Sequence, residues 1–94
     1  MKDYFSTGTS GSATVGAVST KVLSTNTARK YMIFTNDSDE AIYLSLGAAA
    51  VLNKGICINA AGGSYEMPMA DLQFTGEVYA ICASGGKNLT YIEA

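Results

Sequence analysis

Apolar and polar residues alternate in short runs along most of the chain, which is the pattern of half-buried β-strands. In the clearest run, residues 41–47, the isoleucine and the two leucines fall on one face, and Tyr43 and Ser45 fall on the other. A stretch rich in Asn, Asp and Ser joins this run to residues 29–36, which are rich in β-branched and aromatic side chains. The sequence therefore predicts a β-hairpin over residues 29–47.

Other runs predict further strands, with turn signals roughly ten residues apart. Residues 77–83 are apolar on both faces, as expected of a central strand, and residues 84–87 predict a hairpin turn before the last strand. Residues 48–54 and 69–73 each leave open a single helical turn. The remaining predicted strands cover residues 13–23, with a bulge or bend near Gly16, then 56–59, 64–67 and 88–93.

This spacing predicts an all-β fold. We expect a compact antiparallel β-sandwich, jelly-roll-like, or a small barrel, of six to seven short strands. Residues 1–12 are mostly Gly, Ser and Thr, with Tyr4 and Phe5 as the only bulky groups, so we expect a flexible N-terminal arm that frays or orders against a partner. Residues 13–94 are then a single β-sandwich domain.

The composition excludes several kinds of chemistry. The chain has no His, which removes Ser–His and Cys–His nucleophile pairs and the commonest metal ligand. Six basic residues against eight acidic ones cannot make the basic footprint of a nucleic-acid-binding protein. No apolar run is long enough for a secretory signal or a membrane span, so we expect synthesis in a cytoplasm and no membrane contact. We expect a non-enzymatic protein without cofactor or metal.

Candidate sites are few, and each has a simpler structural interpretation. Asp37, Asp39 and Glu40 lack the spacing of a calcium loop and are expected to be a solvated turn. The sequence Gly-Gly-Lys-Asn at residues 85–88 lacks the remainder of a phosphate-binding loop. A pair of catalytic carboxylates is conceivable, but nothing in the sequence places any two in one cleft; the candidates are Glu66, Asp71, Glu77 and Glu93.

The cysteines and tyrosines leave alternatives open. Cys57 and Cys82 lie in apolar runs and are expected to be reduced core thiols, with a disulfide as the alternative. Tyrosine rings can anchor an interface, stack on sugars or cap the edges of a core. Tyr31 and Tyr43 are expected to face outward or against a second subunit. The six tyrosines are Tyr4, Tyr31, Tyr43, Tyr65, Tyr79 and Tyr91.

Only 15% of the residues are charged, and the net charge is −2. A small monomer normally keeps its surface charged to remain soluble. We therefore expect part of the surface to be covered by copies of the same chain or by another protein. Such association also covers exposed sheet edges, which otherwise invite aggregation.

Five motifs follow one another in a recognisable order. They are an arginine-led apolar run at residues 29–36, Ile-Tyr-Leu at 42–44, Gly-Ile-Cys-Ile at 55–58, Gly-Gly-Ser-Tyr-Glu at 62–66 and Thr-Gly-Glu-Val-Tyr-Ala-Ile at 75–81. Over residues 13–93 this order resembles small accessory virion proteins of tailed bacteriophages. The motifs build turns and core, so no functional residue is carried over.

The resemblance implies a non-enzymatic structural protein that decorates or cements the capsid, or belongs to a head or tail appendage. It implies a virion location after assembly in the host cytoplasm. The implied partners are the chain itself, as a dimer, trimer or larger ring, and other virion proteins such as the major capsid protein. The alternative is a carbohydrate- or receptor-binding β-sandwich module of a phage fibre or tail.

Overall fold

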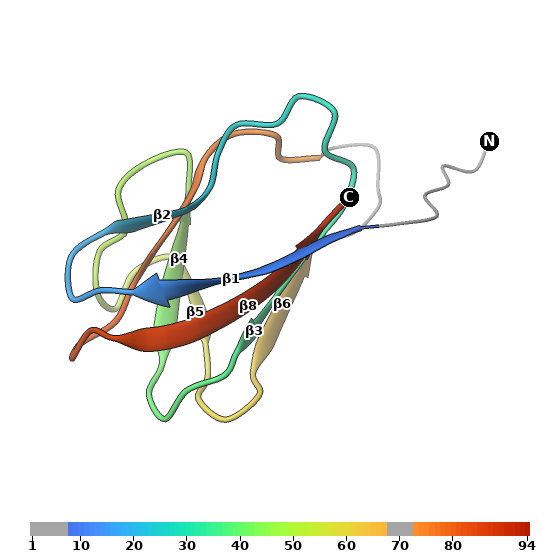
Figure 1. Cartoon of the computed structure of the whole chain (residues 1–94). Helices are drawn as coiled ribbons and strands as arrows, with labels where there is room; N and C mark the ends of the chain where they lie inside the picture. Colours follow the sequence, from blue (N-terminus) through green and yellow to red (C-terminus); the bar gives the residue numbers. More distant parts are fainter. Residues whose placement is uncertain (1–7, 68–72) are drawn as a thin grey trace.

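The alternating runs fold into two four-stranded antiparallel sheets that pack face to face (Figure 1). The computed structural model of the chain describes residues 8–67 and 73–94. Sheet A has the strand order β1-β8-β3-β6 and sheet B the order β2-β7-β4-β5. The strands of this described part are β1 Thr9–Val15, β2 Thr20–Leu23, β3 Met32–Asn36, β4 Ile42–Leu46, β5 Ile56–Ile58, β6 Ser64–Met67, β7 Val78–Ile81 and β8 Lys87–Glu93.

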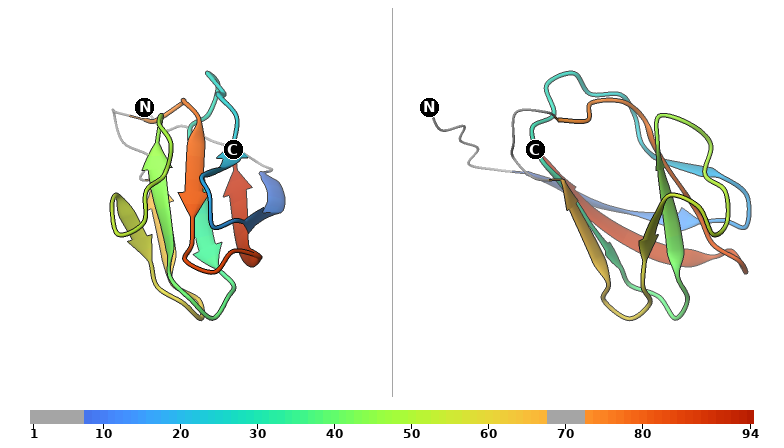
Figure 2. Two further views of the ribbon diagram at one scale, coloured as in Figure 1. Left: turned by 90° about the vertical axis from the view of Figure 1, so that its left-hand side faces the viewer. Right: turned by 180° about the vertical axis from the view of Figure 1, so that it is seen from behind.

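The predicted sandwich is confirmed, and the sheets do not close into a barrel (Figure 2). The described part of the chain has eight strands rather than six or seven, because the run predicted over residues 13–23 forms two strands. The chain leaves β1 at Gly16, near the predicted bend, and crosses to the other sheet as β2. Of consecutive strands only β4 and β5 pair with each other, and this alternation between sheets is the strand order of a jelly roll.

The predicted hairpin over residues 29–47 is wrong. β3 pairs with β6 and β8 in sheet A, whereas β4 pairs with β5 and β7 in sheet B. The tight turn between them exists, but it carries the chain across the sandwich. The same correction applies at residues 84–87, where Gly85 and Gly86 take positive φ angles of 78° and 68° and β7 passes to β8 in the other sheet. Alternation specifies which side chains are buried, not which strand lies alongside.

Other local predictions have mixed outcomes. Residues 48–54 form an irregular connection rather than a helical turn, with Asn53 at a positive φ of 65°. Most of the second possible helical turn, residues 69–72, lies outside the described residues, as do residues 1–7 of the predicted arm. The later part of that arm, from Thr9 to Ser12, belongs to β1. No helix in the described part of the chain is long and apolar enough to cross a membrane.

The core lies between the sheets and is built from alternate positions of each strand. The predicted period of two in β4 is confirmed for Ile42 and Leu44, whereas Leu46 is exposed at the strand end. β7 lies between β2 and β4 and buries three of its four residues, as expected of a central strand. A Cβ at Gly11 in β1 would lie 2.6 Å from the ring of Tyr91, so any other residue there would require this ring to move.

Arg29 closes one end of the sandwich with a buried side chain that is 1% exposed. Its Nε donates to the Glu93 carboxylate at 2.7 Å, at the end of β8. Nη1 donates to the carbonyls of Phe74 and Gly76 at 3.1 and 2.9 Å, and Nη2 donates to the Ser24 carbonyl at 2.7 Å. One guanidinium therefore joins the segment after β2, the segment before β7 and the last strand.

Asn36 organises turns at the opposite end of β3 with a second buried polar side chain. Its Nδ2 donates to the carbonyls of Glu40 and Ile58 at 2.8 and 2.9 Å, and its Oδ1 accepts from the Ser38 hydroxyl at 2.6 Å. Its backbone N–H donates to Gly63 at 2.8 Å. These bonds hold the β3–β4 and β5–β6 connections against each other. They therefore stabilise the passage of the chain from β3 in sheet A to β4 in sheet B, where the sequence pattern predicts a hairpin turn.

Replacing Arg29 with methionine is expected to lower the free energy of unfolding by about 3–5 kcal/mol, because it leaves Glu93 and three carbonyls without their buried donor. Denaturant unfolding followed by circular dichroism measures this loss. Lys30→Met is the matched control, since the neighbouring Lys30 side chain is exposed and its loss is expected to be within about 0.5 kcal/mol of zero. Equal effects of the two substitutions would contradict the structural role of Arg29.

Candidate interaction surface

The outer face of sheet A is uncharged across three neighbouring strands. The register pairs Ser10 with Ile92 and Ile92 with Ile33, so these side chains form one row across β1, β8 and β3. The next row contains Ser12, Thr90 and Thr35 in the same way. Ile92 is 41% exposed, which is high for a large aliphatic side chain. The eight outward positions on these strands are Ser10, Ser12, Thr14, Ile33, Thr35, Asn88, Thr90 and Ile92.

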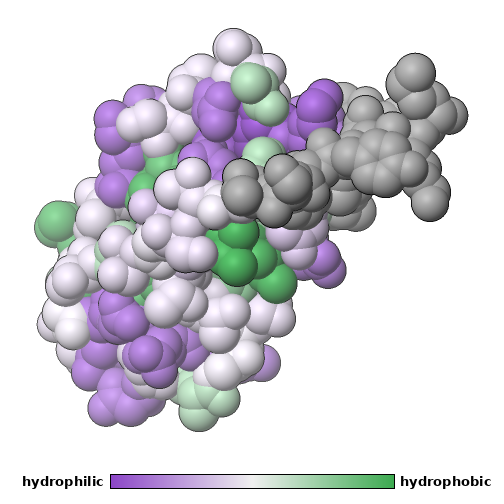
Figure 3. Space-filling model, turned by 45° about the vertical axis from the view of Figure 1, so that its right-hand side comes forward, coloured by the Kyte–Doolittle hydropathy of each residue, from purple (hydrophilic) through white to green (hydrophobic). Residues whose placement is uncertain are grey.

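An open groove of about 410 Å³ lies on this face. It is lined by aliphatic and hydroxyl side chains and by backbone, and its lining residues are Ser10, Gly11, Ile33, Thr35, Thr90, Tyr91 and Ile92. Figure 3 shows hydrophobic patches among pale, near-neutral surface on this side of the molecule. Such a surface offers apolar area and neutral hydrogen-bonding groups, which suits contact with another protein surface more than recognition of an ion.

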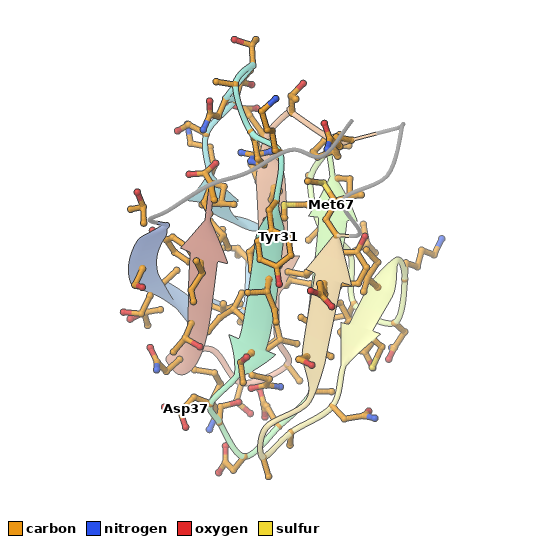
Figure 4. The ribbon with its side chains drawn as sticks, turned by 90° about the vertical axis from the view of Figure 1, so that its right-hand side faces the viewer. Tyr31, Asp37 and Met67 are labelled. Carbon is orange, nitrogen blue, oxygen red and sulfur yellow. The ribbon has the colours of Figure 1, made fainter. Side chains whose placement is uncertain are left out.

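The tyrosines that the structure describes are all partly buried. Tyr65 and Tyr91 lie opposite Phe34 in register and pack against the core, which agrees with the core-capping interpretation for these two. Tyr31 lies on the outer side of sheet A near one end of β3, with Asp37 at the other end (Figure 4). Its hydroxyl donates to Glu66, and this hydrogen bond raises the pKa of Tyr31.

Two tyrosines lie on the outer face of sheet B. Tyr43 donates to the Asn53 side chain at 3.1 Å, and Tyr79 donates to the Glu77 carboxylate at 2.7 Å. The second bond raises the pKa of Tyr79 and lowers that of Glu77. Both hydroxyls are thus held by the chain's own side chains. Tyr4 lies outside the described residues.

The acidic cluster at residues 37–40 is built into the turns. Asp39 forms an ion pair with Lys87 at 2.7 Å, and Asp37 accepts from the Asn88 side chain at 3.2 Å. Ser84 donates to both oxygens of Glu40, through its N–H at 2.7 Å and its hydroxyl at 2.9 Å. Within residues 8–67 and 73–94, no group of three or more acidic or Cys side chains is arranged to hold a metal ion. Lys87 of the Gly-Gly-Lys-Asn motif serves the same turn.

The other candidate carboxylates have separate partners. Glu66 accepts from Tyr31 on the outside of sheet A, while Glu93 is taken up by Arg29. Glu77 bonds to Tyr79 and lies 3.6 Å from the Lys21 ammonium. The fourth, Asp71, lies outside the described residues. Each of the described three is therefore engaged by a different side chain.

The cysteine prediction is half wrong. Cys82 is a buried, free thiol that donates to the Val15 carbonyl at 3.3 Å, and burial raises its pKa. Cys57 is also free, but it is exposed, because it is the outward residue of the three-residue edge strand β5. The two thiols do not form a disulfide.

The groove residues were not found from the sequence. Ile33 and Ile92 are 59 positions apart, and each lies in a run that also supplies buried side chains. Only the pairing of β3 with β8 brings them together. Comparison with protein-family models, with curated proteins and with solved structures gives no match for this chain.

The two thiols are expected to react at very different rates with a water-soluble disulfide reagent. Cys57 is expected to react in the folded protein roughly a hundredfold faster than Cys82, which requires local opening. Absorbance of the released thiolate measures both phases. A Cys57→Ser variant should lose the fast phase and keep the slow one; two fast thiols in the wild type would contradict the burial of Cys82.

Acid is expected to weaken the link between the β3–β4 and β7–β8 turns. The hydrogen bonds from Ser84 lower the pKa of Glu40, so this contribution to stability is present above the ordinary carboxyl pKa and is lost as pH falls through the lowered value. Glu40→Gln is expected to be less stable than the wild type at about pH 7, with the difference shrinking toward about pH 3. Thermal unfolding at constant ionic strength measures the difference, and an unchanged gap at low pH would contradict this account.

Proposed function

We propose that the chain is a non-enzymatic structural protein that self-associates and lies on the virion of a tailed phage, as a capsid decoration or cement protein or a head or tail accessory protein. The observation that carries the proposal is the part of the outer face of sheet A that is uncharged across β1, β8 and β3, with Ile92 exposed at its centre. The resemblance of residues 13–93 to small virion proteins supports the same setting, and it is what links the surface to a phage particle.

The physical basis is non-covalent. Covering a face of hydroxyl and aliphatic side chains removes apolar area from water without leaving a charge unpaired, since none of its eight outward side chains is charged. Burial of this kind at a junction between subunits raises the free energy needed to separate them. The major capsid protein and further copies of this chain are the proposed partners.

The groove supports a structural role over the alternative, a carbohydrate- or receptor-binding module. Stacking on a sugar requires an exposed aromatic ring. Tyr91, the aromatic residue in the lining, packs against the core beside Phe34, with ring centroids 6.4 Å apart. The remaining lining side chains are aliphatic or carry hydroxyl groups, which suits a flat protein contact.

Purified protein is expected to form a dimer or larger complex in light scattering across a hundredfold dilution, and to be retained by particles of the encoding phage grown without it. Ile92→Lys is expected to reduce retention roughly tenfold or more, because it places a charge in the apolar contact. Val51→Lys is the matched control: Val51 is 52% exposed, but it lies in the connection between β4 and β5, outside this face. A monomer that is absent from the particles would overturn the proposal.

A further inference from the structure

Sheet edges expose unpaired backbone groups, and most proteins protect them with charge, proline, bulges or short strands. The sandwich has four edge strands in its described part: β1 and β6 in sheet A, and β2 and β5 in sheet B. β2 carries Lys21 and an irregular register between Lys21 and Leu23. β6 has four residues and carries Glu66, and β5 has only three residues. Each of these three edges is thus protected.

The fourth edge strand, β1, has none of these protections. It has seven residues, and its pairing with β8 runs without a break from Thr9 to Val15. The strand has no proline and no charged residue, and the sequence is uncharged over the 17 residues from Tyr4 to Thr20. Figure 4 shows β1 at the side of sheet A with no described element beyond it. Its outward side chains are small and exposed, so nothing on the strand bars a close approach.

An identical strand is the partner that suits this edge best. Antiparallel pairing of two copies about a two-fold axis places the middle residue of each strand opposite itself. Ser12 is the middle residue of β1, so the contact at the axis joins two small neutral side chains. The same pairing through β2 or β6 would bring lysines or glutamates of the two copies close to the axis, where like charges repel.

We propose that two copies of the chain associate through antiparallel pairing of their β1 strands. The two sheets A then form one eight-stranded sheet whose outer faces are continuous, so the two grooves point to the same side. This inference rests on the proposed self-association and adds the surface and the symmetry through which it occurs. The interaction is backbone strand addition, with the second copy of this chain as the added strand.

The test uses opposite charges at Ser12, which is exposed on the outer face of β1. Ser12→Lys and Ser12→Glu each place two like charges at the axis, so each variant is expected to dissociate about tenfold more readily than the wild type in light scattering. An equal mixture of the two is expected to restore association, because lysine then faces glutamate. Ser64→Lys is the matched control, since Ser64 is an exposed serine on β6, the other edge of the same sheet.

The outcomes separate this inference from the proposed function. Wild-type dimers that both Ser12 variants leave intact would overturn pairing through β1 while self-association stands. Variants that dissociate but do not recombine in the mixture would overturn the two-fold antiparallel arrangement. A wild-type chain that is monomeric at every concentration would overturn the inference and the proposed self-association together. Thermal unfolding of each variant shows that the charges have not unfolded the chain.

Discussion

The buried ion pair between Arg29 and Glu93 is the contact on which the architecture depends. A guanidinium removed from water requires a carboxylate and further acceptors, and Arg29 finds all of them in segments far apart in the sequence. Glu93 is the last residue of β8, so the pair positions the end of that strand. Among the described strands, β8 alone pairs with β1, and it also pairs with β3. The Arg29 guanidinium therefore helps to position both the outer face of sheet A and its edge strand β1, through Glu93 at the end of β8.

At each end of the sandwich, one buried polar side chain forms hydrogen bonds to several of the segments that connect the strands. The apolar core fills the space between these two ends. Asn36 does at its end, with neutral hydrogen bonds, what Arg29 does with charge. The long-range hydrogen bonds of Arg29 and Asn36 explain which parts of the fold could be predicted from the sequence and which could not. Alternation predicted β4, apolar residues on both faces predicted the central β7, and the spacing of such runs predicted the sandwich. Alternation could not reveal that β3 and β4 separate, because that depends on the Asn36 amide donating to the Glu40 carbonyl in the β3–β4 connection and to the Ile58 carbonyl in β5.

The proposed interaction surface was likewise predictable only in part. The low charge of the sequence led to the expectation that part of the surface is covered, since charge is a property of composition. The location of that surface was not predictable, because an outward position is defined only once strands are paired. Ile33 and Ile92 become neighbours through the β3–β8 register, and Cys57 becomes exposed because β5 is an edge strand. The local sequence of a strand determines which of its side chains are buried. Which residues are neighbours on a face, and which strand lies at an edge, depends on how all strands of the sheet pair.

Sheet A combines two features that are unfavourable for a solitary chain: an outer face that is uncharged across β1, β8 and β3 and exposes an isoleucine, and an uncharged edge strand of seven residues. The other three edge strands show that this sequence accommodates charges, bulges and short strands where an edge stays in water. β1 lacks these protections, so the unprotected edge and the uncharged part of the outer face both belong to sheet A. Covering the edge with a second copy leaves the face free, and pairing the edges makes that face twice as wide. The proposed pairing therefore uses the edge of sheet A, and the proposed docking onto a larger surface uses its outer face.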